Sequence, residues 1–248
     1  MLYAQDTTVT KDTRHLNSFY VTFVFSGKMI IIVDEGPDIF FARRTLDFEI
    51  GYSYSRIFNH KKSQLEFGFY IGRYNYSQQM KLNVDKVIDL QYGDYSKVFL
   101  YNRKTVYFDY NYNFTFDYWH RFFNKYGNCT SVMLGLNFLS PTTYKYEFGY
   151  YYVGEKQPNG EIVDIPILDV PCQRAYMGQP FYLGIDFGIG HTYRLWRRSK
   201  VKFSLLFRYF PKVTFHGSYE TTTEADFEAK GRFYKQPSDL AFRISYIF

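Results

Sequence analysis

The chain has 248 residues, of which 23% are aromatic, and it carries a formal net charge of +6 at pH 7. Its mean hydropathy is −0.35, and no apolar run approaches the roughly 18 residues that indicate a transmembrane helix. The basic residues gather in short segments, His60-Lys61-Lys62 and Arg197-Arg198-Ser199-Lys200, without the glycine-rich or zinc-ligand context of a nucleic-acid module, so no nucleic-acid partner is expected. One domain is expected, because all-β proteins of this length commonly remain undivided.

The first 17 residues are expected to precede the folded domain, which would span residues 18–248. Met1 to Asp6 looks like the end of a secretory signal, with the small residue Ala4 where cleavage would fall. Residues 5–17 are polar and lack periodicity. We therefore expect a signal-peptide remnant followed by a polar tail, and export of the chain.

Alternation of apolar and polar residues predicts four β-strands in the first half of the chain, over residues 19–25, 46–55, 65–72 and 108–118. The fourth is the clearest, because one face is wholly aromatic and the other is polar. Its aromatic face holds Phe108, Tyr110, Tyr112, Phe114, Phe116 and Tyr118. Its polar face holds Asp109, Asn111, Asn113, Thr115 and Asp117. Residues 33–44, which contain Gly36-Pro37, and residues 78–103 are predicted to be loops.

Four more strands are predicted in the second half, over residues 131–138, 181–190, 201–209 and 240–248. Short turns at residues 59–63, 124–128 and 197–200 alternate with the longer loops, two of which are predicted near residues 153–180 and 217–232. Eight strands joined in this rhythm are typical of an up-and-down antiparallel barrel.

The last strand has the most distinctive pattern. Leu240, Phe242, Ile244, Tyr246 and Phe248 share one face, and the other face carries a charge at Arg243. A chain that ends on such a strand resembles the small, eight-stranded outer-membrane β-barrel proteins of Gram-negative bacteria. The resemblance implies that this strand closes the barrel, that the insertion machinery reads its aromatic end, and that the protein lies in the outer membrane.

The predicted fold class is therefore all-β, a transmembrane up-and-down antiparallel β-barrel of eight strands with periplasmic N- and C-termini. A ten-stranded barrel is the alternative, with Glu161 to Val170 as an extra strand. A soluble lipocalin-like barrel would need its apolar face inside, where so many aromatic rings would overfill the lumen. An apolar outside and a charged inside is the simpler arrangement.

The charged residues of the inner face are predicted to form a plug of salt bridges, because an unpaired buried charge is costly. They are Asp47, Glu49, Glu66, Asp109, Asp117, Asp186, Lys202, Arg208 and Arg243. A small pore is the alternative, although eight strands leave little bore. Inward glycines such as Gly51 are expected to make room for bulky neighbours.

Aromatic residues and a cation precede each short turn, in Tyr54-Ser55-Arg56-Ile57-Phe58, Tyr118-Trp119-His120-Arg121-Phe122 and Tyr193-Arg194-Leu195-Trp196-Arg197. Such residues suit a membrane–water interface and predict an aromatic girdle there.

Cys129 falls at a turn and Cys172 in a long loop on the opposite side, so the two are not expected to form a disulfide.

Signals for catalysis are few. The histidines lack metal-ligand spacing, so neither a metal nor a cofactor is expected. His216-Gly217-Ser218, with Glu220 nearby, is similar to the His-x-Ser element of outer-membrane lipid A deacylases, which implies Ser218 as nucleophile, His216 as base and a glutamate that orients it. The residues that follow the serine in that family are absent here. The alternative to catalysis is a polar strand end.

The long loop near residues 153–180 is unusually apolar for a segment exposed to water. Its candidate partner-binding residues are Ile162, Val163, Ile165, Ile167, Leu168 and Val170. Exposed apolar patches often mark interaction sites, so this loop would dock on another envelope protein; the alternative is that it folds over the barrel mouth as a lid. We therefore expect a structural or interaction protein of the envelope, in contact with outer-membrane lipid and lipopolysaccharide and with another outer-membrane protein. A lipid A-modifying hydrolase and a small pore are the alternative functions.

Overall fold

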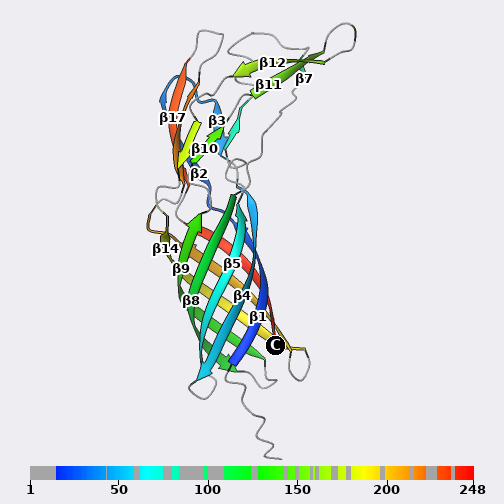
Figure 1. Ribbon diagram of the computed structural model, residues 1–248, viewed down its shortest axis with the longest axis vertical. Helices are drawn as coiled ribbons and strands as arrows, with labels where there is room; N and C mark the ends of the chain where they lie inside the picture. Colours follow the sequence, from blue (N-terminus) through cyan, green and yellow to red (C-terminus); the bar gives the residue numbers. More distant parts are fainter. Residues whose placement is uncertain are drawn as a thin grey trace, which may run out of the picture.

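The computed structural model is an all-β molecule built around a closed eight-stranded barrel, with smaller sheets beyond one end of it (Figure 1). It describes residues 15–42, 44–58, 62–74, 80–83, 98–99, 109–123, 128–141, 145–148, 151–156, 159, 162–168, 173–176, 180–195, 199–212, 215–221, 228–235 and 238–248. Within these ranges there is no helix of the length and apolar character that a bilayer crossing requires.

The eight barrel strands confirm the eight strands predicted from the sequence. They are β1 (His15–Phe25), β4 (Leu46–Phe58), β5 (Ser63–Tyr74), β8 (Asp109–Phe123), β9 (Cys129–Pro141), β14 (Tyr182–Arg194), β15 (Lys200–Tyr209) and β18 (Ser238–Ile247). Their order around the barrel is β1-β18-β15-β14-β9-β8-β5-β4, and neighbours are antiparallel. The predicted end of the N-terminal tail at residue 17 is wrong, because His15, Leu16 and Asn17 already pair with β4.

The first and last barrel strands close the ring. Ser18 pairs with Ile247 and the register continues to Phe25 and Leu240. Beyond the ladder, the Phe248 amide donates to the Asn17 carbonyl at 3.0 Å and the Asn17 amide donates to the Phe248 carbonyl at 3.2 Å. The Phe248 ring stacks on Phe19, with centroids 5.6 Å apart. The predicted closing role of the last strand is confirmed.

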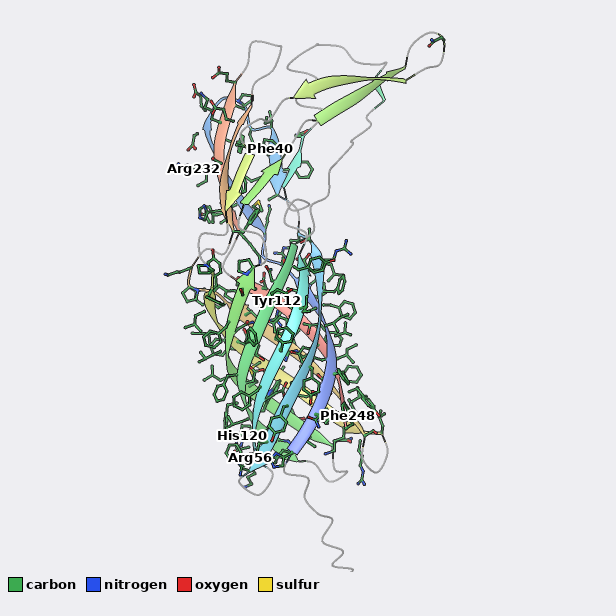
Figure 2. The ribbon with its side chains drawn as sticks, in the orientation of Figure 1. Phe40, Arg56, Tyr112, His120, Arg232 and Phe248 are labelled. Atoms are coloured by element: carbon green, nitrogen blue, oxygen red, sulfur yellow. The ribbon has the colours of Figure 1, made fainter. Side chains whose placement is uncertain are left out.

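The outer face of the barrel is apolar and rich in aromatic rings (Figure 2). Alternate residues point outward along each strand, so rings on neighbouring strands meet in directly opposed pairs. Phe67 lies opposite Phe116, with centroids 4.9 Å apart, and Phe69 lies opposite Phe114 at 5.1 Å. Each barrel strand reaches the ~9–11 residues that a membrane-crossing strand needs. The barrel therefore presents a continuous apolar surface suited to hydrocarbon.

The segments predicted as long loops contain strands, so the prediction of loops without strands is wrong. The predicted loop 33–44 holds the end of β2 (Met29–Glu35) and all of β3 (Phe40–Ala42), and residues 78–103 hold β6 (Met80–Leu82) and β7 (Val98–Phe99). The predicted loop 153–180 holds most of β11 (Tyr151–Lys156) and all of β12 (Ile162–Leu168) and β13 (Gln173–Tyr176), and the predicted loop 217–232 holds most of β16 (His216–Thr221) and the start of β17 (Ala229–Lys235). A further strand, β10 (Lys145–Phe148), lies before the first of these loops. Their partners are distant in sequence, as where Lys235 pairs with Met29, so no local turn signal marks them.

These strands form three sheets beyond the barrel (Figure 1). The largest has the order β10-β13-β16-β17-β2, the second has the order β12-β11-β7, and the third pairs β3 with β6. The ten-stranded alternative is wrong, because β12 pairs with β11 outside the barrel. At the turn after β2, Gly36 has a φ of 78°, a left-handed conformation that glycine adopts without strain.

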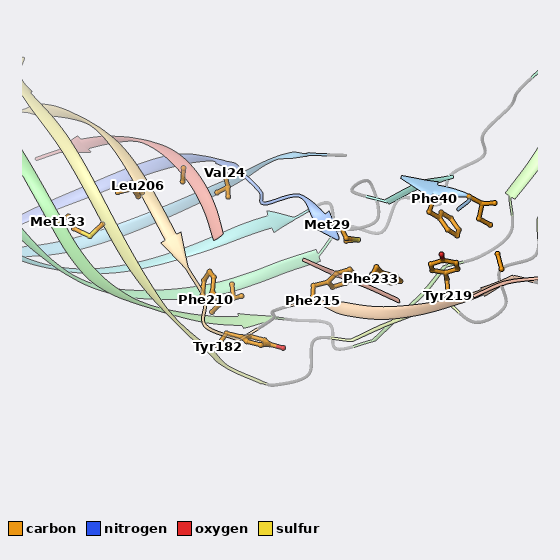
Figure 3. Close-up of a cluster of buried hydrophobic side chains, with 14 of the residues drawn as sticks. Val24, Met29, Phe40, Met133, Tyr182, Leu206, Phe210, Phe215, Tyr219 and Phe233 are labelled. Carbon is orange, nitrogen blue, oxygen red and sulfur yellow. The ribbon is translucent and has the colours of Figure 1, made fainter. Parts of the chain in front are cut away.

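A buried apolar cluster runs from the barrel mouth into the five-stranded sheet (Figure 3). Leu206 and Phe210 contribute from the barrel side, and Met29, Phe215 and Phe233 contribute from the sheet side. Its buried members also include Val24, Ile39, Phe40, Tyr182, Tyr219 and Ala229. Because the barrel and the five-stranded sheet share one core, the sheet is packed onto the barrel and is more than a loose extension of it.

We predict that a charge on the outer face destabilises the barrel according to its depth. Phe114 and Phe122 are both on β8 and both 51% exposed, but Phe114 lies near the middle of the strand and Phe122 near its end. Phe114→Arg should lower the free energy of unfolding in phospholipid vesicles by about 2–4 kcal/mol, and Phe122→Arg by about 0–1 kcal/mol. Urea titration followed by circular dichroism measures both. Equal tolerance of the two changes would show that the outer face does not meet hydrocarbon.

Candidate functional site

The barrel interior contains charged side chains that reach across it from opposite walls. Nearest the sheets, Arg208 of β15 donates from Nη1 to Glu49 Oε1 at 2.5 Å and from Nη2 to Glu49 Oε2 at 2.8 Å. Glu49 belongs to β4, and β1 and β18 separate it from β15 around the ring. Asp186 Oδ2 lies 3.7 Å from Arg208 Nε. The fork geometry is the strongest form of this charge pair.

Two neutral side chains complete this upper layer. The Tyr70 ring lies 5.0 Å from the Arg208 guanidinium carbon. Asn137 donates through Nδ2 to the Tyr70 hydroxyl at 2.7 Å and lies 3.3 Å from Asp186 Oδ2. β5, which carries Tyr70, is diametrically opposite β15 in the ring. Side chains from facing walls thus meet at the barrel axis.

A second layer lies around Arg243, near the middle of β18. Its Nη1 is 3.9 Å from Glu66 Oε1 and 3.9 Å from Asp117 Oδ2. β8, which carries Asp117, is diametrically opposite β18. Arg243 also donates from Nε to Thr22 Oγ1 at 3.3 Å, and its guanidinium lies 4.3 Å from the Tyr20 ring. These partners come from three strands, β1, β5 and β8, so Arg243 links the interior walls.

The third layer is a cation–π contact near the short-turn end. Lys202 Nζ lies 2.9 Å from the centroid of the Trp119 ring, and both side chains are buried. β15 and β8 carry these residues and are separated by β14 and β9. A desolvated cation on a tryptophan face is stabilising by about 2 kcal/mol. The indole thus contributes to the interior as the partner of a charge.

Gly51 shows why the inward glycines are needed. A Cβ on this residue would lie 2.5 Å from the Tyr20 ring and 2.6 Å from Tyr70 Cβ. A methyl group therefore cannot fit without displacing two rings of the interior network. The expectation that inward glycines make room for bulky neighbours is confirmed at this position.

The other predicted interior residues lie near the sheet end of the barrel. Asp47 is buried and accepts a hydrogen bond from Ser26 Oγ at 2.6 Å. β8 begins at Asp109, whose side chain lies outside the described part of the structure. The sequence interpretation missed the buried pair of Lys235 with Asp239, joined at 2.8 Å. The two residues are four positions apart, one at the end of β17 and the other near the start of β18, and this spacing gave no sequence signal for an interior ion pair.

The predicted aromatic girdle is right for some residues and wrong for others. Tyr118 and Phe122 are exposed on the outer face, as expected. Trp119 and Arg121 are 1% and 7% exposed and belong to the interior. The prediction grouped residues 118–122 by composition, whereas the twofold alternation of β8 divides them between the two faces. Trp196 lies outside the described residues.

The three residues proposed for lipid hydrolysis lie on one exposed face of β16. His216, Ser218 and Glu220 alternate with Gly217 and the buried Tyr219. Glu220 Oε1 is 3.1 Å from Lys230 Nζ, and this hydrogen bond raises the pKa of Lys230. The Glu220 carboxylate is thus engaged by a lysine on the neighbouring strand β17.

Two further predictions depend on loop residues. Ile162, Val163, Ile165, Ile167 and Leu168 form β12, at the edge of the three-stranded sheet, and Val170 lies outside the described residues. Cys129 is a buried free thiol at the start of β9, and Cys172 lies outside the described residues. Among the residues that are described, no group of three or more His, Cys, Asp or Glu side chains is placed to hold a metal ion.

An apolar exterior, a charged interior and eight antiparallel strands in closed order are now established. These are the properties that a membrane-spanning barrel requires. The fold is that of a small outer-membrane β-barrel. No protein-family model and no curated protein matches the sequence.

Comparison with solved structures finds outer-membrane barrels at low sequence identity. Neisserial surface protein A is 8% identical with a TM-score of 0.43, covering 94% of this chain and 96% of that chain. The outer membrane protein OprG from Pseudomonas aeruginosa is 10% identical with a TM-score of 0.46, covering 94% and 95%. A major outer membrane protein from Thermus thermophilus is 8% identical with a TM-score of 0.44, covering 94% and 98%.

We predict that breaking the Glu49–Arg208 pair from one side destabilises the outer-membrane barrel strongly. Glu49→Gln leaves a buried guanidinium without its carboxylate and should cost about 3–5 kcal/mol of unfolding free energy. The double change Glu49→Leu with Arg208→Met should cost less than the two single changes added together.

Equilibrium unfolding in lipid vesicles provides the measurement. The matched control is Asp34→Asn, because Asp34 accepts a similar two-nitrogen contact from Arg232 but both side chains are solvent-exposed. That change should leave the free energy of unfolding nearly unchanged. Strict additivity of the two interior changes would contradict a direct coupling between Glu49 and Arg208.

Proposed function

We propose that this chain is an outer-membrane barrel whose interior is closed by its own side chains, and that it acts as a structural or interaction protein through the sheets beyond the barrel. The observation that carries this proposal is the approach of Arg243 to Asp117, at 3.9 Å, from diametrically opposite strands. Contacts of this kind occupy the axis, where a solute would have to pass.

The closed interior is supported at three heights. Arg208 with Glu49, Arg243 with Asp117 and Lys202 with Trp119 each join strands that are not neighbours in the ring. An eight-stranded barrel is narrow enough for side chains to fill. A pore would need these paired charges to separate, and separation would leave each of them buried without its partner.

The proposed location is the outer membrane, after export with a cleaved signal peptide. The short connections lie at one end of the barrel together with the start of β1 and the end of β18, and the sheets lie at the other end (Figure 1). In barrels of this type, short turns face the periplasm and longer segments face outward. The orientation proposed here places both termini in the periplasm and the sheets outside the cell.

The proposed interaction surface lies on these outer sheets. The sequence of β12 has an apolar residue at each alternate position, Val163, Ile165 and Ile167, and the strand stands at the edge of its sheet. Edge strands offer backbone groups that can pair with another chain. The proposed partners are another outer-membrane protein at the sheets, and outer-membrane lipid and lipopolysaccharide around the barrel.

We predict that the purified barrel gives no discrete conductance steps in planar bilayers, because its axis is occupied by paired side chains. Protein whose refolding has been verified by its heat-dependent shift on gels is the sample to use, with protein-free bilayers as the baseline. Regular single-channel steps from the folded fraction would overturn the closed interior and favour the pore.

We predict that co-purification of a partner depends on β12. Tagged protein is extracted from native outer membranes in mild detergent, and bound proteins are identified by mass spectrometry. Changing Val163, Ile165 and Ile167 to Asn should remove a stoichiometric partner, while the neighbouring Asp164→Asn change should retain it. Recovery of the barrel with no protein partner would contradict the interaction role.

A further inference from the structure

The end of the barrel that carries the short connections bears basic side chains on its outside. His15 of β1, Arg56 of β4, His120 of β8 and His191 of β14 all lie on the lipid-facing side of their strands (Figure 2 labels Arg56 and His120). Lys62 is exposed in the connection between β4 and β5. Among the described residues at this end, the acidic side chains are Glu66 and Asp117, which lie opposite each other in the strand register and are buried in the interior beside Arg243.

The sequences of the connections continue the same charge. Residues 59–62, 124–128 and 195–199 include Lys61, Lys125, Arg197 and Arg198, and they contain no Asp or Glu. The opposite end differs, since exposed carboxylates there balance the cations. Asp34 faces Arg232 in an ion pair, and Lys230 contacts both Glu220 and Glu228. The net positive charge of the chain is therefore concentrated at one end of the barrel.

The pair of β1 and β4 shows a site built at this end. His15 lies directly opposite Arg56 in the strand register. The His15 ring stacks on Tyr54, with centroids 5.7 Å apart, and Nδ1 shares a hydrogen bond with the Tyr54 hydroxyl. One step further along the barrel, the Tyr52 hydroxyl donates to Asn17 Oδ1 at 2.6 Å. The imidazole is thus held against a tyrosine, next to a guanidinium, at the edge of the apolar band.

The other two histidines repeat the arrangement. His120 meets Phe122 edge-on at 4.8 Å, and His191 lies 4.5 Å from Tyr193 and hydrogen-bonds through Nδ1 to Thr130 Oγ1 at 2.9 Å. Tyr and Trp rings of membrane proteins are enriched at the level of the lipid headgroups. Nitrogen donors placed beside such rings therefore lie at the height of the lipid phosphates, while the Phe and Ile side chains above them would contact the acyl chains.

We propose that this end of the barrel binds the phosphate groups of anionic phospholipids, with Arg56 and His15 as one defined headgroup site. A guanidinium presents paired N–H donors that match two phosphate oxygens, and an imidazole N–H adds a further donor. No Asp or Glu side chain among the described residues at this end faces outward, which favours a headgroup with net negative charge over a zwitterionic one. The occupant is a lipid headgroup, because the site adjoins the surface that contacts acyl chains.

The test uses the full-length protein in phosphatidylcholine vesicles with a trace of spin-labelled phosphatidylglycerol or spin-labelled phosphatidylcholine. Electron paramagnetic resonance gives the fraction of each label immobilised at the barrel surface. The wild type should retain phosphatidylglycerol in preference to phosphatidylcholine. Arg56→Gln should lower that preference by about fivefold, the effect of removing one cation near a membrane surface.

The matched control is Arg232→Gln, which changes net charge equally but lies in the outer sheet, paired with Asp34. Its lipid preference should equal that of the wild type. Raising the salt concentration to about 1 M, where the Debye length falls to about 3 Å, should weaken the preference of the wild type without any mutation. The proposal is overturned by a wild type that shows no preference, by an unchanged Arg56→Gln variant, or by an equal loss in Arg232→Gln.

Discussion

The need to pair every backbone amide and carbonyl inside hydrocarbon underlies this architecture. A bilayer supplies no water to an unpaired strand edge, so a sheet can cross it only when closed. β1 and β18 provide the closure, although more than two hundred residues separate Ser18 from Ile247 in the sequence. Once the ring is closed, each strand has one face toward lipid and one toward the interior, and the twofold alternation of side chains becomes a division between two chemical environments.

That division accounts for the charges inside. Strands with apolar residues on both faces would fit the barrel in either of two registers, because a shift of one residue exchanges the faces. Glu49, Asp117 and Arg243 prevent the exchange, since each would be placed in lipid by such a shift. Their cost of burial is offset by partners from the facing walls, as in the contact of Arg208 with Glu49. The same contacts that select the register also join facing walls of the barrel.

The two ends of the barrel serve different surroundings. At one end, short connections lie beside the outward-facing Arg56, and Tyr54 and Phe122 provide exposed rings nearby. At the other end, the chain continues into the five-stranded sheet, joined to the barrel by a core that includes Leu206, Phe210 and Phe233. The exposed ion pairs of that sheet, such as Arg232 with Asp34, are suited to water and contribute little to its stability.

The sequence by itself determined the eight barrel strands, their order and the direction of their faces. A period of two across 108–118 is a local pattern, and the aromatic end of the chain specifies which strand closes the ring. It also indicated that Glu49, Asp117, Arg208 and Arg243 lie inside.

Only the tertiary structure decided which of them meet, because partners such as Arg243 and Asp117 are brought together by barrel curvature and side-chain length. The outer sheets were likewise decided by tertiary pairing, since β2 and β17 are short and join residues 29–35 to residues 230–235 with no local signal to connect them. Trp119 also could not be placed from its residue type. Tryptophan is typical of a membrane interface, but the alternation of side chains along β8 points Trp119 into the barrel interior.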